Sequence, residues 1–157
     1  MHEVALRPIE DSDLGTLFEF MRDPESVWMA AFTAEDPDDR DAFDNHMRRV
    51  LADPDAKNWA ITRGGRFVGS IAAFVLEGDT EITYWIDRDV WGQGVASRAL
   101  ALLLEKVSVR PLRARAASDN VASLSVLRKA GFTIVGTESA YAPARRTEIE
   151  ETILRLD

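Results

Sequence analysis

The first third of the chain changes from strand-like to helix-like spacing of its apolar residues. Val4, Leu6 and Pro8 alternate with polar residues, which predicts a short strand. Apolar residues then recur at helical spacing between positions 14 and 21, after acidic and serine residues that can cap a helix. Asp23-Pro24 ends that helix. No clear period follows over 26–32, and a second helix is predicted from after Pro37 to near 53–54.

The middle and the end of the chain contain most of the predicted strands. Two β-rich runs at 58–63 and 67–76 are joined by Gly64-Gly65, a strong hairpin signal, and a third strand at 80–86 follows another turn. A helical pattern begins at Gly94 and is predicted to end at Pro111. The remaining predicted elements are a strand at 112–117, a helix at 121–130, and strands at 132–135 and 149–156.

The predicted order of elements is β-α-α-β-β-β-α-β-α-β-β. The chain has no internal repeat, low-complexity segment or dividing linker, and 157 residues are enough to bury a core. We therefore expect one α+β domain over residues 1–157.

Composition excludes several classes of function. A formal net charge of −8 disfavours nucleic acid and anionic lipid as partners, because both select clustered Lys and Arg. The absence of cysteine excludes disulfides, a thiolate nucleophile and Cys-based zinc sites. The N-terminus lacks the pattern of a signal peptide, and the longest apolar run, 99–104, is far too short to span a membrane. We expect a cytoplasmic protein that binds neither membrane nor nucleic acid.

The segment 84–97 carries the clearest chemical signal. A strand, a short loop containing Gly92 and Gly94, and an apolar helix follow one another. The glycines allow close approach of the backbone, and the free N–H groups at a helix N-terminus attract an anion. The arrangement fits a phosphate, although Gly-x-Gly before a helix is also found in plain capping turns. A dinucleotide fingerprint lacks its third glycine, because Ser97 stands there, and no P-loop Gly-Lys-Ser/Thr is present.

Two blocks of sequence resemble the GNAT superfamily of acetyltransferases, in particular its Rim-type branch of ribosomal-protein N-acetyltransferases. One block is Tyr84-Trp85-Ile86 followed by Trp91-Gly92-Gln93-Gly94-Val95-Ala96, similar to the family's coenzyme-binding motif. The other is Asn120-Val121-Ala122-Ser123 followed by Leu127-Arg128-Lys129-Ala130-Gly131-Phe132. Most of the superfamily has Gln or Arg where Trp91 stands, whereas Trp at that position is similar to the Rim-type branch.

The resemblance implies a fold and an activity. The fold is a GNAT-like domain with a central mixed, mostly antiparallel sheet flanked by helices. The activity is transfer of an acetyl group from acetyl-CoA, without a metal, to the amine of a protein N-terminus or a small molecule, by direct attack in a ternary complex. A non-catalytic acyl-CoA-binding domain and a different acyl donor remain alternatives. A homodimer is possible, since similar enzymes are often dimers.

The resemblance also implies a coenzyme site. The strand end at Trp85, Ile86 and Asp87 pairs with the pantetheine arm, in a slot opened by a splay between that strand and 112–117. Asn120 contacts the pantetheine or a bound water. The backbone that holds the pyrophosphate is that of Trp91, Gly92, Gln93, Gly94, Val95, Ala96 and Ser97.

Candidate catalytic residues are Ser123 and Glu81. Ser123 matches a serine of the Rim-type branch that is suggested to protonate the thiolate, and the alternative is a helix serine that bonds its own backbone. Glu81 lies where related enzymes place a base, and the alternative is a solvated strand carboxylate. Tyr84 lies on the opposite face of that strand and is assigned to the core. Of Glu150 and Glu151 only one can face a central cleft, and the sequence does not decide between them.

Candidate acceptor-binding residues are Trp28 and Phe32, because the corresponding region varies with substrate in similar enzymes. The simpler interpretation, which we favour, is that both aromatic residues are core and that the nearby carboxylates cap a helix. Those carboxylates are Asp36, Asp38, Asp39 and Asp41. They do not form an EF-hand, which requires Gly and Glu at positions that hold Asp41 and Met47. Two histidines are too few for a metal site and give no support for a hydrolase triad.

Overall fold

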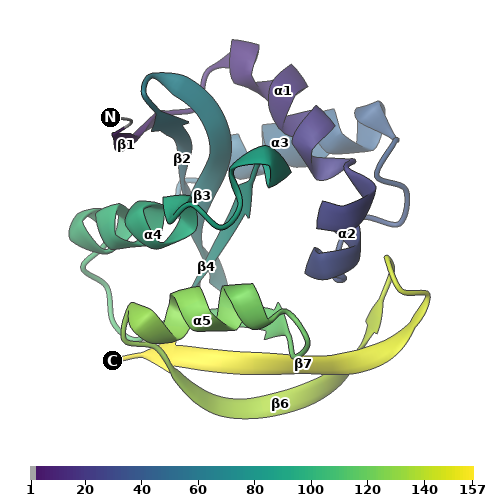
Figure 1. The fold of residues 1–157 in the computed structure, drawn as a ribbon, viewed down its shortest axis with the longest axis vertical. Helices are drawn as coiled ribbons and strands as arrows, with labels where there is room; N and C mark the ends of the chain where they lie inside the picture. The colour runs from purple at the N-terminus through teal and green to yellow at the C-terminus, as the bar shows by residue number, and fades with distance from the viewer. Residues whose placement is uncertain (1–2) are drawn as a thin grey trace.

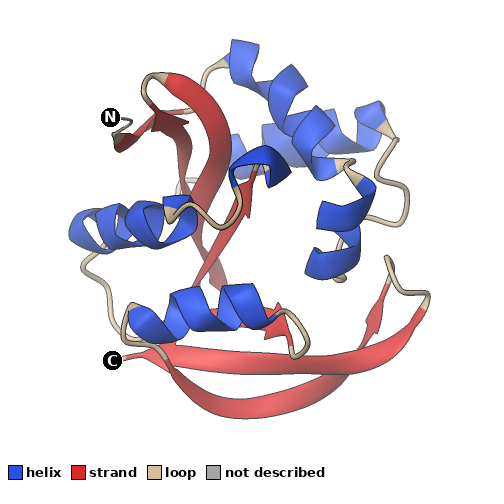
Figure 2. Ribbon diagram, viewed as in Figure 1, coloured by secondary structure: helices blue, strands red, loops and turns tan. Residues whose placement is uncertain are grey.

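Seven strands form one twisted sheet in the order β1-β2-β3-β4-β5-β7-β6 in the computed structural model, which describes residues 3–157 (Figures 1 and 2). All neighbouring strands are antiparallel except β4 and β5, which are parallel. The predicted α+β fold with a mixed, mostly antiparallel sheet is therefore confirmed. The strands are β1 (Val4–Pro8), β2 (Lys57–Arg63), β3 (Arg66–Leu76), β4 (Asp79–Ile86), β5 (Leu112–Ala117), β6 (Thr133–Ala142) and β7 (Thr147–Leu156).

The helices lie on both faces of this sheet. Helices α4 and α5 share one face, where they pack against the main hydrophobic core, and α1, α2 and α3 lie on the other side (Figure 1). None of the helices in the described part of the chain has the length and apolar character needed to cross a bilayer. Their bounds are α1 (Asp11–Met21), α2 (Pro24–Ala30), α3 (Arg40–Ala52), α4 (Val95–Lys106) and α5 (Val121–Lys129), with a short 3₁₀ helix η1 (Arg88–Val90) before α4.

Several predicted boundaries are confirmed. The β2–β3 hairpin turns at Gly64 and Gly65, whose φ angles of 59° and 81° are the positive values that such a tight turn requires. Strand β5 covers the predicted residues 112–117, and α3 ends at Ala52, next to the predicted stop. Turn glycines and the prolines next to the ends of elements therefore predicted these boundaries well.

Helix α2 was missed, because Asp23-Pro24 was interpreted only as a stop signal. The Asp23 side chain accepts a hydrogen bond from the backbone N–H of Ser26, and Pro24 occupies the first turn. The same dipeptide therefore ends α1 and begins α2. The seven residues of α2 are too few to display a helical period.

Two other boundaries were wrong. Helix α4 ends at Lys106 rather than at Pro111, because Val107 adopts an extended conformation and its side chain is buried. Strand β6 continues to Ala142, beyond the predicted end at 135. Its second half lies at the edge of the sheet and is mostly exposed, so it carries little apolar alternation that a sequence pattern could detect.

Strands β4 and β5 separate soon after they meet. Their only paired residues are Thr80 with Leu112 and Glu81 with Arg113. Beyond these pairs the sheet opens, so that the end of β4 has β3 on one side and no strand on the other. In Figure 1, β2 and β3 lie in the upper part of the molecule, while β6 and β7 lie across the bottom. The predicted splay between the two strands is present.

Candidate functional site

The N-terminus of α4 differs from those of the other α-helices in residues 3–157. Gly94 is its N-cap residue, with φ of 80°, and no side chain caps the helix. Helices α1, α2, α3 and α5 each begin with a side-chain cap or a capping box. The first-turn N–H groups of α4 have no carbonyl one turn earlier to bond, and they carry the positive end of the helix dipole. The start of α4 is therefore available to an acceptor from outside the chain.

The loop in front of α4 borders open space. A β-carbon placed on Gly92 or Gly94 would have no neighbouring atom within 4 Å. Both residues have positive φ angles, 73° and 80°, which glycine adopts without strain. This space and the uncapped helix together fit a pyrophosphate that lies against the backbone.

Side chains of the loop hold its shape. The Trp91 indole donates from Nε1 to the carbonyl of Ile86 at 3.0 Å. The Gln93 side chain accepts from the Arg63 guanidinium and donates to the carbonyl of Asp89 at 3.4 Å. The Val95 side chain is buried in the core, so at that position only the backbone is available to a ligand.

The end of β4 is held by side-chain contacts, while its backbone edge towards the splay pairs with no strand. Trp85 donates from its indole to the Phe20 carbonyl of α1 at 3.1 Å, and Ile86 is buried in the core. Asp87 is buried as well; it accepts from the N–H of Asp89 and thereby caps η1. The strand edge that faces the splay therefore belongs to a rigid segment.

Tyr84 and Ser123 meet across the open side of β4. Their hydroxyl oxygens are 2.8 Å apart, and Ser123 lies in the first turn of α5. Burial raises the pKa of the Tyr84 phenol, and the bond with Ser123 only partly opposes that shift. The assignment of Tyr84 to the core is thus incomplete: its ring packs against the core, but its hydroxyl reaches Ser123. Alternation along the strand predicted the correct face for Tyr84. Its hydrogen-bond partner could not be predicted in the same way, because it depends on where α5 lies in the fold.

The Asn120 side chain is bonded within the protein. Its oxygen accepts from the backbone N–H of Ser123 at 3.2 Å and so caps α5. Its amide nitrogen donates to the carbonyl of Met29 at 3.4 Å. Asn120 therefore links the start of α5 to α2.

Glu81 belongs to a charged network on the opposite face of the sheet from Tyr84. Only 5% of the residue is exposed, so it is not a solvated strand carboxylate. It accepts from Nε of Arg115 at 3.0 Å, and the same guanidinium lies 3.2 Å from Glu138 and 3.8 Å from Glu151. Arg115 therefore joins carboxylates from three strands, a role that the sequence pattern did not reveal.

The network also distinguishes Glu150 from Glu151. Glu151 faces Arg115 and is half-buried, whereas Glu150 lies on the other face and is exposed. Burial raises the pKa of the Glu151 carboxyl, and the attraction of Arg115 only partly offsets that rise. Glu151 is therefore the member of the pair that joins Glu81.

Trp28 is exposed, which contradicts its assignment to the core. Trp28 is 54% exposed, and the Arg145 guanidinium lies 4.5 Å from the centre of the indole ring. Arg145 also donates to the Trp28 carbonyl at 2.8 Å and pairs through two bonds with Asp119. Arg145 thus connects α2, the β6–β7 turn and the segment before α5. Trp28 is on the surface because α2 turns its aromatic side chain towards this connection.

Phe32 is partly buried against three alanines from different segments, Ala31, Ala117 and Ala142. For this residue the core assignment is confirmed in part.

The nearby carboxylates have structural partners, as predicted for part of the group. Asp39 caps α3 by accepting from the N–H of Ala42, and Asp38 pairs with Arg22 at 2.9 Å. Asp36 accepts from the backbone N–H of Asp38. Within residues 3–157, no three or more His, Asp or Glu side chains come together in a way that would hold a metal ion.

The sequence matches a known family over most of its length. The model of the acetyltransferase (GNAT) domain matches residues 3–133. The chain belongs to the GNAT acetyltransferase family. The match includes the glycine loop, α4, the splayed strands and α5, so the elements described above are those of the family. No curated protein sequence matches the chain.

Solved structures of other proteins share the fold. RimL, a ribosomal L7/L12 alpha-N-protein acetyltransferase in complex with coenzyme A, has a TM-score of 0.82 at 19% identity, over 98% of this chain and 93% of that one. Mycobacterium smegmatis RimJ in complex with CoA-disulfide has a TM-score of 0.83 at 21% identity, over 98% and 81%. The microcin C7 self-immunity acetyltransferase MccE, in complex with acetyl-CoA and AMP, has a TM-score of 0.81 at 14% identity, over 98% and 92%. At these identities the likeness shows a common architecture.

Proposed function

We propose that this GNAT protein is an N-acetyltransferase, which moves an acetyl group from acetyl-CoA to an amine by direct attack in a ternary complex. The observation that carries the proposal is the uncapped N-terminus of α4 behind Gly92 and Gly94, at the end of the β4–β5 splay. A helix start and a free strand edge lie side by side there, and they suit the two chemically different parts of the coenzyme, its pyrophosphate and its amide-containing arm.

The backbone supplies most of the coenzyme contacts. The N–H groups from Trp91 to Ser97 hold the pyrophosphate, and each hydrogen bond to a charged oxygen contributes about 1.5–3 kcal/mol. The edge of β4 from Trp85 to Asp87 pairs with the pantetheine arm as an added strand does. Asn120 orients the start of α5 beside it. RimL, RimJ and MccE, which have coenzyme A or its derivatives bound in their structures, support this assignment.

Ser123 supplies the proton that the departing thiolate needs. Bound acetyl-CoA provides the thioester carbonyl and the thiolate leaving group. The Tyr84 hydroxyl, 2.8 Å from Ser123, fixes the orientation of the serine and offers a proton to it. Because burial raises the pKa of Tyr84, the phenol keeps that proton at neutral pH.

Glu81 is the proposed base on the acceptor side, with Glu151 as the second candidate on the same face. The raised pKa of Glu151 suits a group that takes a proton from an amine. An α-amine with a pKa of about 7.7–8.0 is already about a tenth neutral at pH 7, whereas a lysine side chain costs about 4–5 kcal/mol to deprotonate. A strong base is thus less necessary for a protein N-terminus. Trp28 and Phe32 line the acceptor side in this proposal.

Thiol release from acetyl-CoA against a panel of amines, polyamines, antibiotics and short peptides tests the function. Thermal shift with acetyl-CoA and with other acyl-CoAs accompanies it. Turnover with any acceptor establishes the transferase and names the acceptor class. A thermal shift without turnover on any donor or acceptor favours a non-catalytic acyl-CoA-binding domain. Neither shift nor turnover would contradict the coenzyme assignment itself.

A further inference from the structure

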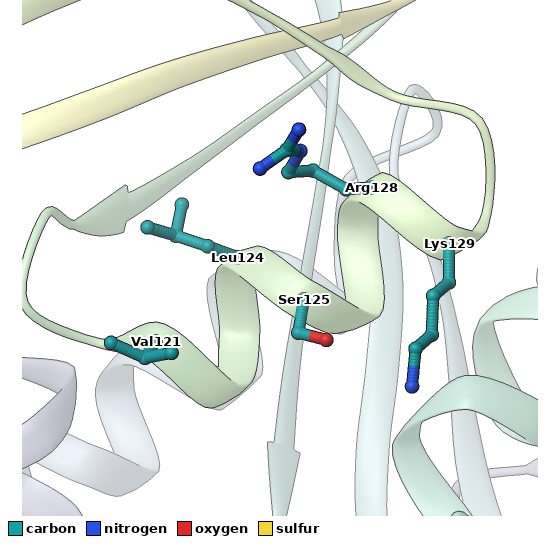
Figure 3. Close-up of a pocket in the computed structure, with 5 residues that line it drawn as sticks. All are labelled: Val121, Leu124, Ser125, Arg128 and Lys129. Atoms are coloured by element: carbon teal, nitrogen blue, oxygen red, sulfur yellow. The ribbon is translucent and has the colours of Figure 1, made fainter.

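Helix α5 carries Ser123 but has few buried side chains of its own. Of its nine residues only Leu127 is buried. Its outer side borders an open groove of about 490 Å³, and Figure 3 shows the side chains that line this groove: Val121, Leu124, Ser125, Arg128 and Lys129. A helix this short takes most of its stability from tertiary contacts. The position of Ser123 therefore depends on the contacts made at the start of α5.

Helix α2 connects the two halves of the sheet at the open end of the splay. At its N-terminus, Asp23 and Glu25 pair with Arg88 of η1, which follows β4, at 2.8 Å and 3.0 Å. At its C-terminus it bonds to the β6–β7 turn and to the segment before α5. Strands β4 and β5 share only two pairs of residues. Helix α2 thus joins, mainly through side chains, two parts of the sheet whose backbones have separated.

The chain leaves α2 through a strained residue. Ala31 has φ of 66°, a value that alanine adopts only with strain, and it is completely buried. Its carbonyl accepts from the N–H of Ala144 in the β6–β7 turn at 3.1 Å. Such a conformation persists only where the surrounding structure fixes it. The end of α2 is therefore a firmly held point to which other segments can be attached.

Arg145 links this point to the start of α5. Its Nε donates to the Trp28 carbonyl at 2.8 Å, and its two terminal nitrogens donate to the Asp119 carboxylate at 2.8 Å and 3.1 Å. Only 7% of the Arg145 side chain is exposed, and a two-bond pair of this kind has a defined geometry. Asp119 precedes Asn120, whose side-chain oxygen accepts from the Ser123 N–H at 3.2 Å. One guanidinium thus joins α2 to the segment that carries Ser123.

We propose that Arg145 is a positioning residue for Ser123, because it holds the start of α5 against α2. It acts through the Asp119 carboxylate and does not touch the reacting atoms. This inference rests on the proposed function, since it requires Ser123 to protonate the departing thiolate. Proton transfer needs the hydroxyl within hydrogen-bond reach of the sulfur, and a shift of about 1 Å can cost about a hundredfold in rate. Because Trp28 lines the acceptor side in that proposal, Arg145 also couples the acceptor side to the proton donor.

A double-mutant cycle between Arg145→Gln and Ser123→Ala tests the proposal. The probe is the amine of the acceptor panel that releases thiol from acetyl-CoA fastest. Arg145→Gln loses the two-bond pair and should lower kcat about tenfold. In the Ser123→Ala background the same substitution should change kcat by less than about twofold, because the group that it positions is absent. The Kd for acetyl-CoA, measured by calorimetry, should stay within about twofold.

Two further variants test the same link if Arg145→Gln does not fold. Asp119→Ala removes the partner carboxylate, whose side chain is 61% exposed, and should reproduce both the loss in kcat and its dependence on Ser123. Arg145→Lys keeps the charge but cannot form the two-bond pair, so its kcat should lie between those of the wild-type protein and Arg145→Gln. This partial rescue is not expected if the side chain only fills space.

Arg7→Gln is the matched control. Arg7 forms the same kind of two-bond pair with Asp13, at 2.7 Å and 2.9 Å, and β2 and β3 separate its strand from β4. The substitution should lower Tm, because it leaves a buried carboxylate without its partner, but it should keep kcat within about twofold.

An unchanged kcat in Arg145→Gln would overturn the proposal. An equal loss in the Ser123→Ala background would overturn it too, because Arg145 would then act independently of the serine. A similar loss of kcat in Arg7→Gln would show that reduced stability alone explains the effect, against the proposal. Absence of turnover by the wild-type protein would instead overturn the proposed function, and with it this inference.

Discussion

Two hydroxyl groups from distant parts of the chain form the contact most relevant to proton transfer. Tyr84 comes from β4 and Ser123 from α5, and their 2.8 Å bond spans the open side of the splay. A serine hydroxyl alone is a weak acid, whereas a phenol behind it can replace the proton that it gives. Because burial raises the pKa of that phenol, the pair remains protonated through the neutral range.

Ser123→Ala should lower kcat about 10–100-fold and leave the Kd for acetyl-CoA within about twofold, because the hydroxyl acts on the leaving group rather than in binding. Steady-state kinetics and calorimetry measure the two quantities. The control Ser139→Ala removes an exposed hydroxyl from β6 and should change neither. An unchanged kcat for Ser123→Ala would remove this serine from the mechanism.

Tyr84→Phe should also lower kcat, and its effect should not add to that of Ser123→Ala. If the two hydroxyls act as one unit, the double variant should be about as slow as the slower single variant. A pH profile of kcat for all three variants completes the cycle. Additive losses would mean that the Tyr84 hydroxyl acts independently of Ser123.

At the level of the elements, the connection between β4 and α4 combines a left-handed backbone with an open surface. Gly94 has φ of 80° and open space where a side chain would begin. Gly78, in the β3–β4 turn, shares both properties, with φ of 85° and no atom within 4 Å of the place where a β-carbon would lie. The two glycines differ only in the part of the structure beside them, and only Gly94 lies at the proposed coenzyme site. Gly78→Ala is therefore a matched control for Gly94→Ala.

Gly94→Ala and Gly78→Ala should each lower the free energy of unfolding by about 1 kcal/mol, because alanine is strained at positive φ. Only Gly94→Ala should also weaken coenzyme binding, about tenfold or more, since its methyl group enters the space where the pyrophosphate lies. Denaturant unfolding and calorimetry measure the two effects. Equal coenzyme affinity in both variants would contradict the proposed position of the pyrophosphate.

The sequence predicted those elements whose signals are local. Turn glycines defined the β2–β3 hairpin, and the glycine loop before α4 marked the start of the proposed coenzyme site. Helix α2 and the second half of β6 were missed because one is too short for a period and the other is exposed at an edge. In the site, strand alternation correctly predicted that Glu81 and Tyr84 lie on opposite faces of the sheet. It could not pair Tyr84 with Ser123 or Glu81 with Arg115, since those contacts depend on tertiary packing.

At the scale of the whole molecule, Arg115 balances carboxylates from β4, β6 and β7. Three carboxylates share one guanidinium, so the network is short of positive charge. Glu151 is the carboxylate most affected, because burial raises its pKa despite the nearby arginine. When the folded state has a higher pKa than the unfolded chain, ionisation of that group destabilises the fold, and the destabilisation disappears as the pH falls through the folded pKa.

Glu151→Gln should therefore raise Tm at pH 7 by about 2–4 °C, which corresponds to about 1 kcal/mol in a protein of this size. The gain should diminish as the pH falls through the raised pKa of Glu151, because the wild-type carboxyl then takes up its proton. Melting curves of both proteins across this range give the difference directly. Glu150→Gln alters the exposed neighbour in the same way and serves as the control. A lower Tm for Glu151→Gln at pH 7 would show that its bond with Arg115 outweighs its burial.

The shortness of the β4–β5 pairing has a consequence for how the protein unfolds. Only Thr80 with Leu112 and Glu81 with Arg113 join the backbone of β1–β4 to that of β5–β7. Each half of the sheet has its own ladder of antiparallel hydrogen bonds, and the two halves are joined mainly by the hydrophobic core that they share. A pantetheine arm hydrogen-bonded along β4 would fill the gap between the two halves of the sheet and hold them together. Amide hydrogen exchange should then proceed at two separate rates in the free protein and converge towards one slow rate when coenzyme binds.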